Sequence, residues 1–173
     1  QSRWNATWAN ALVRGFVAMS FLWAAFDTWH YRPVQLSYYT ELVGGLRGAA
    51  RLGLEPTYYW DALDENAIGW LNQNTRPGEK VLFCNYAQDS FQYLDQWGTL
   101  RVNIWPHEPG RWRWYVLQNR PGLFAEKPWD RWLAEHGRPA YTHEHDGVPL
   151  LWVFPIEEYE KARRQTERTT QGD

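Results

Sequence analysis

Residues 141–154 have the sequence YTHEHDGVPLLWVF, and this stretch predicts a β-hairpin. Asp146 and Gly147 lie between its two halves, and this pair favours a two-residue type I′ turn because both residues tolerate a positive φ angle. Residues 150–154 are apolar throughout instead of alternating with polar residues. We therefore expect the second strand of the hairpin to lie inside a sheet and not on a half-solvated surface.

The chain before and after the hairpin alternates between strand and helix patterns. Apolar runs predict further strands at residues 81–84, 100–105 and 113–118. Helical spacing predicts helices that begin near Trp60 and near Asp89, and others at residues 129–136 and 156–168. The prediction is an α/β fold with a mixed sheet of about five strands, flanked by helices and preceded by an apolar N-terminal helix. Residues 169–173 are expected to fray.

The composition narrows the classes of protein to which this chain can belong. A chain of 173 residues with 44% hydrophobic and 22% charged residues is long and apolar enough for one folded domain, and it is not typical of a disordered protein. A formal net charge of -2 gives no overall attraction to nucleic acid. The 13 tryptophans favour a membrane interface, a sugar-stacking surface or a protein contact, and a heavily aromatic core is the alternative.

The N-terminal region contains an uncharged stretch at residues 15–26. As a helix it would measure about 18 Å, against roughly 30 Å for the hydrocarbon core of a membrane. If the helix starts near Ala9 and Arg14 reaches the membrane surface, the segment is a marginal membrane span or the end of one, with an aromatic belt formed by Trp23, Trp29 and Tyr31. A buried core helix is the alternative. Because the chain begins at Gln1, we expect a fragment or a processed product.

Residues 31–59 are irregular and rich in glycine. Gly44, Gly45 and Gly48 do not have the spacing of a nucleotide-binding loop, and no Lys-Ser or Lys-Thr pair follows them. We expect these glycines to provide positive φ angles or a close backbone approach in a tight connection.

Two kinds of reactive side chain are candidates for chemistry. His143 and His145 alternate along a strand and could bind a metal if His107 or Glu108 supplied a third ligand; two exposed hairpin histidines are the alternative. Cys84 follows a predicted strand, where it could act as a nucleophile or be an inert buried thiol. It is the one cysteine of the chain, so no intrachain disulfide forms.

An aromatic tract at residues 58–61 forms a candidate binding surface. Tyr58, Tyr59 and Trp60 offer three rings to sugar faces, and Asp61 offers a carboxylate to sugar hydroxyls. The alternative is an aromatic staple at the start of a helix with an acidic first turn.

Several tracts resemble one family of enzymes. They are PVQLSYYTELVGGLRGA at 33–49, TYYWDAL at 57–63, WLN at 70–72, YVLQNR at 115–120 and GVPL at 147–150. In this order they are similar to the segment after the last membrane helix, and to the extramembrane tail, of bacterial glycosyltransferases of the C-type superfamily. These polytopic enzymes are related to protein O-mannosyltransferases and to the aminoarabinose transferases of lipid A. Thr40 departs from the pattern, which has Asn after the tyrosine pair.

The resemblance implies a function for the intact protein. Such enzymes transfer a sugar from a polyprenyl-phosphate donor to a lipid or protein acceptor on the extracytoplasmic side of the bacterial inner membrane. Their catalytic acidic residue lies in a first extracytoplasmic loop that this chain does not contain, so we expect a non-catalytic domain without cofactor or metal, which assists acceptor binding or assembly. Its partners would be the membrane and a lipid-linked sugar or acceptor, and not nucleic acid.

The resemblance also implies a division of the chain and a site. Residues 1–30 would be the apolar helix, 31–156 the extracytoplasmic domain and 157–173 a charged helix and tail. The substrate-binding residues would be Tyr38, Tyr39, Tyr58, Tyr59, Trp60 and Asp61, gathered beside the glycine-rich connection. The rival interpretations are a free-standing Trp-rich binding or interaction domain and a soluble enzyme with a His or Cys site.

Overall fold

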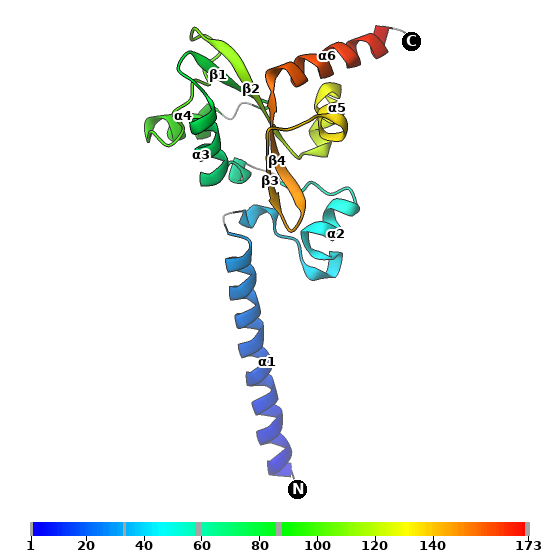
Figure 1. The fold of residues 1–173 in the computed structure, drawn as a ribbon. Helices are drawn as coiled ribbons and strands as arrows, with labels where there is room; N and C mark the ends of the chain where they lie inside the picture. Colours follow the sequence, from blue (N-terminus) through cyan, green and yellow to red (C-terminus); the bar gives the residue numbers. More distant parts are fainter. Residues whose placement is uncertain (1, 33, 58–59, 86–87, 172–173) are drawn as a thin grey trace.

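A computed structural model describes residues 2–32, 34–57, 60–85 and 88–171. Within these ranges, it describes only the backbone of residues 2–7, 61, 88 and 169–171. A long helix, α1 (Ser2–His30), projects from an α/β domain built on a mixed four-stranded sheet (Figure 1). The predicted fold class is therefore confirmed.

The sheet has the strand order β1-β2-β4-β3. Strands β1 (Glu79–Phe83) and β2 (Arg111–Gln118) are parallel, and β4 (Val148–Pro155) pairs antiparallel with both β2 and β3 (Tyr141–His145). The apolar strand β4 thus lies inside the sheet, as its sequence predicted. Asp146 and Gly147 have φ angles of 49° and 68°, which confirms the predicted turn.

The strand predicted at residues 100–105 is wrong. One isolated bridge, between Lys80 and Asn103, joins this segment to β1. Side-chain oxygens accept hydrogen bonds from two backbone N–H groups of this segment. The amide of Arg101 donates to Asn72 Oδ1, and that of Trp105 donates to Asn103 Oδ1. Leu100, Val102 and Ile104 are nonetheless buried, so the apolar pattern of this segment indicates burial and not pairing with a neighbouring strand.

Helices cover both faces of the sheet, with α3 and α4 on one side and α5 and α6 on the other (Figure 1). The helices are α2 (Gly45–Arg51), α3 (Glu65–Asn74), α4 (Gln88–Gln96), α5 (Pro128–His136) and α6 (Ile156–Gln171). Short 3-10 turns are η1 (Gln35–Ser37), η2 (Glu41–Val43), η3 (Trp60–Ala62) and η4 (Pro121–Ala125).

Three helix boundaries differ from the sequence prediction. The helix expected to begin near Trp60 begins at Glu65, because Asp64 caps it by accepting a hydrogen bond from the Ala67 amide at 2.9 Å. Asp89, predicted as an N-cap, lies within the first turn of α4. The last helix, predicted to end at Arg168, continues to Gln171.

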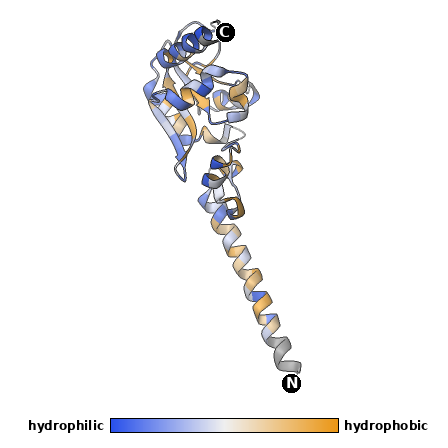
Figure 2. Ribbon diagram, turned by 90° about the vertical axis from the view of Figure 1, so that its right-hand side faces the viewer, coloured by the Kyte–Doolittle hydropathy of each residue, from blue (hydrophilic) through white to orange (hydrophobic). Residues whose placement is uncertain are grey.

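Helix α1 lies outside both hydrophobic cores. Phe16, Phe21 and Leu12 are more than 70% exposed, and none of the segment Trp8–His30 is buried. The alternative of a buried core helix is therefore wrong. These 23 residues correspond to about 35 Å of helix, which is long and apolar enough to cross a membrane. Hydrophobic residues follow the helix along most of its length (Figure 2).

Candidate functional site

A groove runs along the C-terminal half of α1, where the helix meets the segment that follows it. Its volume is about 630 Å³. It is lined by Phe16, Met19, Ser20, Trp23, Ala24, Asp27, Thr28, Tyr31, Gln35 and Tyr38. The lining is mainly apolar in the part of the groove that is far from the domain, at residues 16–24. It is mainly polar close to the domain, from Asp27 onward.

The polar end of the groove holds a carboxylate and two phenols. The Tyr38 hydroxyl donates to Asp27 Oδ2 at 3.3 Å, and its ring lies edge-on to that of Tyr31 at a centroid distance of 5.1 Å. Desolvation and the nearby Asp27 charge raise the pKa of Tyr38, so its hydroxyl is a neutral donor at pH 7. A carboxylate beside a hydroxyl suits a ligand with hydroxyl groups.

The connection after α1 turns back sharply at its glycines. Gly44 and Gly45 have φ angles of 83° and 62°, and a side chain on Gly45 would meet the hydroxyl of Tyr31. The predicted use of these glycines in a tight connection is confirmed. Their effect is to bring α2 back toward the end of α1.

Among the described residues, the aromatic side chains predicted to bind substrate have different surroundings. Tyr38 lines the groove, whereas the Tyr39 hydroxyl donates to the Glu55 carbonyl at 2.6 Å. The partly buried Trp60 ring packs against Phe83 and Phe91 of the core, with both centroid distances at 5.2 Å. Tyr58 and Tyr59 lie outside the described residues, and so does the side chain of Asp61.

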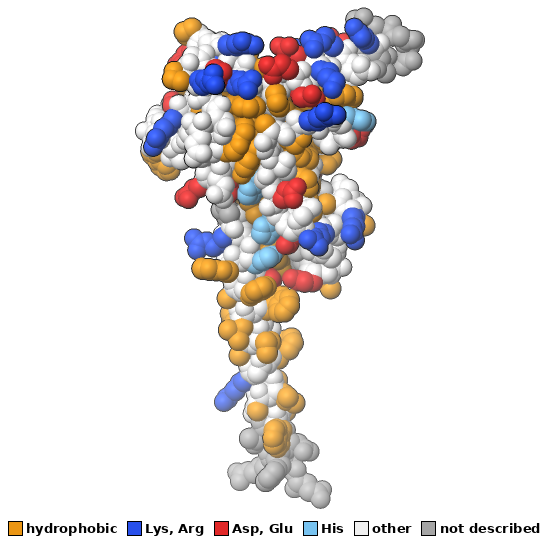
Figure 3. Space-filling view, viewed as in Figure 1, with side chains coloured by type: hydrophobic (Ala, Val, Ile, Leu, Met, Phe, Trp, Pro, Cys, Tyr) orange, Lys and Arg blue, Asp and Glu red, His pale blue; other side chains and the backbone are white. Residues whose placement is uncertain are grey.

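The two hairpin histidines contact different partners. His143 Nδ1 lies 3.7 Å from Asp64 Oδ1, whereas the ring of His145 packs on Tyr31 at 4.7 Å and on His30 at 5.0 Å. Both are partly buried, so the alternative of two exposed hairpin histidines is wrong. Histidine side chains gather on one face where the apolar helix joins the domain (Figure 3).

The potential third ligands named from the sequence lie in another environment. The His107 ring contacts Trp105, and the Glu108 carbonyl accepts a hydrogen bond from Lys80 at 2.7 Å. His145 instead meets His30 and Asp146, and the ligand-type atoms of these three residues lie within 4.8 Å of one another. Imidazole and carboxylate groups are suited to a divalent metal.

Cys84 is buried in the second core, among α5, α6 and the sheet. Burial raises the pKa of its thiol to about 12, so it is protonated at pH 7 and inert. The interpretation as a buried thiol is confirmed. Nearby, the Tyr115 hydroxyl donates to Asp130 Oδ1 at 2.6 Å in a polar pair that the sequence did not reveal.

Sequence reasoning missed three polar residues of this region. Asp27 served only to end an uncharged stretch, His30 was not singled out, and Asp146 was assigned to turn formation alone. A usable signal was present for two of them: Asp27 and His30 are the first ionisable residues after a long apolar run, at the level expected for a membrane surface.

Comparison with known proteins gives no relative for this chain. No protein-family model, no curated protein and no solved structure gives a significant match.

Proposed function

We propose that this chain is the C-terminal extracytoplasmic part of a polyprenyl-phosphate-sugar-dependent glycosyltransferase of the bacterial inner membrane. In this proposal α1 is the last membrane span, and the groove beside it holds a lipid-linked acceptor. The domain assists acceptor binding, while the acidic residue that catalyses transfer belongs to a loop outside this chain. The motifs that resemble the C-type superfamily support the enzyme class.

The change of polarity along the groove carries the proposal. Phe16, Met19 and Trp23 offer an apolar wall to an acyl or prenyl chain, at the depth of the hydrocarbon core. Asp27 and Tyr38 follow at the level where that core would end. An amphiphile with a long chain and a hydroxyl-rich head has the same order of polarity.

The charge at the polar end favours a sugar over a phosphate. The Asp27 carboxylate accepts hydrogen bonds from hydroxyl groups, but it repels a phosphate by Coulomb interaction. The groove is therefore better suited to the sugar head of a glycolipid acceptor than to the phosphate of the polyprenyl donor.

Binding of defined lipids by the purified chain tests the proposal. Native mass spectrometry of the chain, released from detergent micelles, should show glucosyl diacylglycerol retained in preference to phosphatidylglycerol. Ala24→Trp fills the groove and should abolish the preference, whereas Ala25→Trp makes the same change one residue outside the groove lining and should keep it. Equal retention of both lipids, or equal behaviour of the two variants, would contradict the proposal.

A second observation supports the rival function of an interaction domain. Tyr93 of α4 is 59% exposed and Trp97, the residue after α4, is 76% exposed, with their ring centroids 5.9 Å apart. Exposed aromatic pairs of this kind are enriched in protein contacts. The DNA upstream of the Gln1 codon separates the two functions: a continuous frame with many apolar spans supports the transferase, and a start codon or a secretion signal supports the rival.

A further inference from the structure

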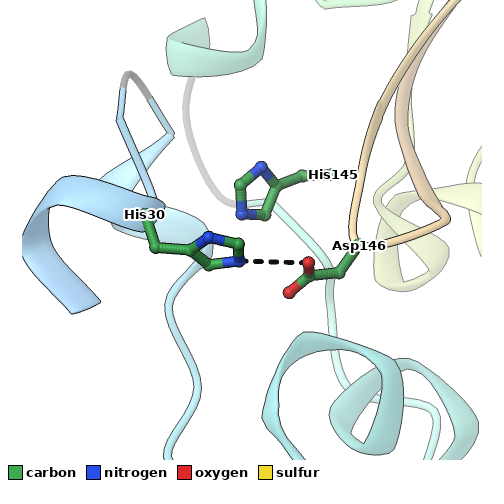
Figure 4. A group of neighbouring side chains, drawn as sticks. All are labelled: His30, His145 and Asp146. Atoms are coloured by element: carbon green, nitrogen blue, oxygen red, sulfur yellow. Dashed lines mark hydrogen bonds and ion pairs between the residues drawn. The ribbon is translucent and has the colours of Figure 1, made fainter. Parts of the chain in front are cut away.

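Three side chains from opposite ends of the chain meet where α1 joins the domain. His30 is the last residue of α1, while His145 ends β3 and Asp146 follows it in the hairpin turn. His30 Nε2 lies 3.1 Å from Asp146 Oδ1, and the two imidazole rings are 5.0 Å apart. Figure 4 shows a ring nitrogen of His145 on the side that faces the His30–Asp146 pair.

One nitrogen atom of this cluster lacks a hydrogen-bond partner in the part of the chain that the structure describes. The Nε2 atom of His145 is buried and has no hydrogen-bond partner among the described residues. A buried polar atom without a partner destabilises the folded state, so its retention calls for an explanation.

The surroundings hold the carboxylate in place. The Tyr31 hydroxyl donates to Asp146 Oδ2 at 3.4 Å, which orients the carboxylate from its other oxygen. Arg47 donates to the Asp146 carbonyl, and this contact fixes the turn in which Asp146 has its positive φ angle. Outer hydrogen bonds of this kind are typical of metal-binding carboxylates.

We propose that His30, His145 and Asp146 bind a divalent metal, for which Zn²⁺ is the best fit. Two imidazoles and one carboxylate are a set of ligands that Zn²⁺ uses, with water in the fourth position. The ligand atoms lie within 4.8 Å of one another, and in a tetrahedral zinc site they would be roughly 3.3 Å apart. Small side-chain rotations close that difference, since His30 and Asp146 are both partly exposed.

Charge around the cluster allows a cation to bind. The Asp146 carboxylate is its anion, and Asp27 lies nearby, where it interacts with Tyr31. The positive charge closest to the turn is that of Arg47, which is directed at a backbone carbonyl. The site would fasten the end of the apolar helix to the β3–β4 turn, and so fix the orientation of the domain relative to α1. This inference does not depend on the proposed function.

Zinc binding by the whole purified chain in detergent micelles tests the inference. Equilibrium dialysis followed by elemental analysis should give one Zn²⁺ per chain, without any affinity tag. His30→Gln and His145→Gln should each weaken binding at least tenfold, and Co²⁺ in place of Zn²⁺ should give the visible absorption of a tetrahedral site. His143→Gln is the matched control on the same strand, and it should bind Zn²⁺ within about twofold of the original chain.

Folding of each variant is checked without metal by its circular dichroism and its thermal unfolding temperature. His30 is suited to this purpose, because its side chain is 43% exposed. The inference is overturned if the chain binds less than one Zn²⁺, or if His30→Gln and His145→Gln bind it as tightly as His143→Gln does. Glycolipid retention is measured separately, so failure here and failure of the proposed function are distinguishable.

Discussion

Gly48 lies against the backbone of Val43, so that a Cβ atom on Gly48 would stand 1.8 Å from the Val43 carbonyl oxygen. No side chain can be added there unless the backbone moves. We expect Gly48→Ala to lower the free energy of unfolding by more than about 2 kcal/mol, because α2 must move away from the segment before it. Thermal unfolding of the chain in detergent, followed by near-ultraviolet circular dichroism, measures the change.

Gly69 provides the matched control for this substitution. It lies within α3, and a Cβ atom there would meet nothing within 4 Å. Gly69→Ala should therefore stabilise the chain, by about 0.5–1 kcal/mol, because alanine loses less conformational freedom in a helix. If Gly48→Ala proved as harmless as Gly69→Ala, the close approach of η2 and α2 would be wrong.

Asp130 predicts an unusual dependence of stability on pH. Burial raises its pKa to about 6 from an ordinary value of 3.8. The folded state thus binds more protons than the unfolded state between these values, so the contribution of Asp130 to stability is fully present below pH 3.8 and is lost as the pH rises through 6. Over this range it amounts to roughly 3 kcal/mol.

The variant Asp130→Asn isolates this contribution. Asparagine has nearly the same shape and keeps an oxygen that accepts the hydrogen bond from Tyr115, but it does not titrate. Chemical unfolding at pH 4, 5, 6 and 7 should show the difference in stability between the original chain and the variant change in favour of the variant as the pH rises. A constant difference would mean that Asp130 titrates near its ordinary pKa.

The exposed surface of α1 predicts binding to lipid bilayers. Leu22 is 67% exposed near the middle of the apolar segment. Leu22→Arg should weaken membrane association by about 3 kcal/mol, or roughly 100-fold, because an arginine at the centre of a span is costly. Trp97→Arg is the control, since Trp97 is 76% exposed and directly follows α4, which lies away from α1 (Figure 1). Sedimentation with liposomes should separate the two variants; equal binding would argue against insertion of α1.

Local chemistry determined how well the fold could be predicted. The hairpin was correct because Asp146 and Gly147 specify their turn by themselves. The strand at residues 100–105 was wrong because Asn72, far from it in sequence, occupies one of its backbone N–H groups. The start of α3 was misplaced because the apolar spacing begins at Trp60, whereas the cap that begins the helix is Asp64.

The site was harder to predict than the fold. Tyr38 was named from the sequence, but as a neighbour of Trp60, whereas the structure pairs it with Asp27 at the end of α1. His30 and Asp146 are 116 residues apart, and no periodicity relates a helix end to a distant turn. Such contacts depend on how α1 and the hairpin are placed by the glycine connection, and a single sequence does not encode that placement in any local pattern.

The pair Asp27 and Tyr38 predicts the lipid selectivity of the groove. If Asp27 accepts hydrogen bonds from a sugar and repels phosphate, Asp27→Asn should weaken retention of glucosyl diacylglycerol and strengthen that of phosphatidylglycerol, since it removes the charge but keeps the shape. Tyr38→Phe removes one hydroxyl and should weaken glycolipid retention about two- to tenfold, the value of one hydrogen bond, without a gain for phosphatidylglycerol. Tyr93→Phe removes a hydroxyl from an exposed ring on α4 and serves as the control. Parallel loss of both lipids in Asp27→Asn would show that Asp27 supports the groove structurally and does not select its ligand.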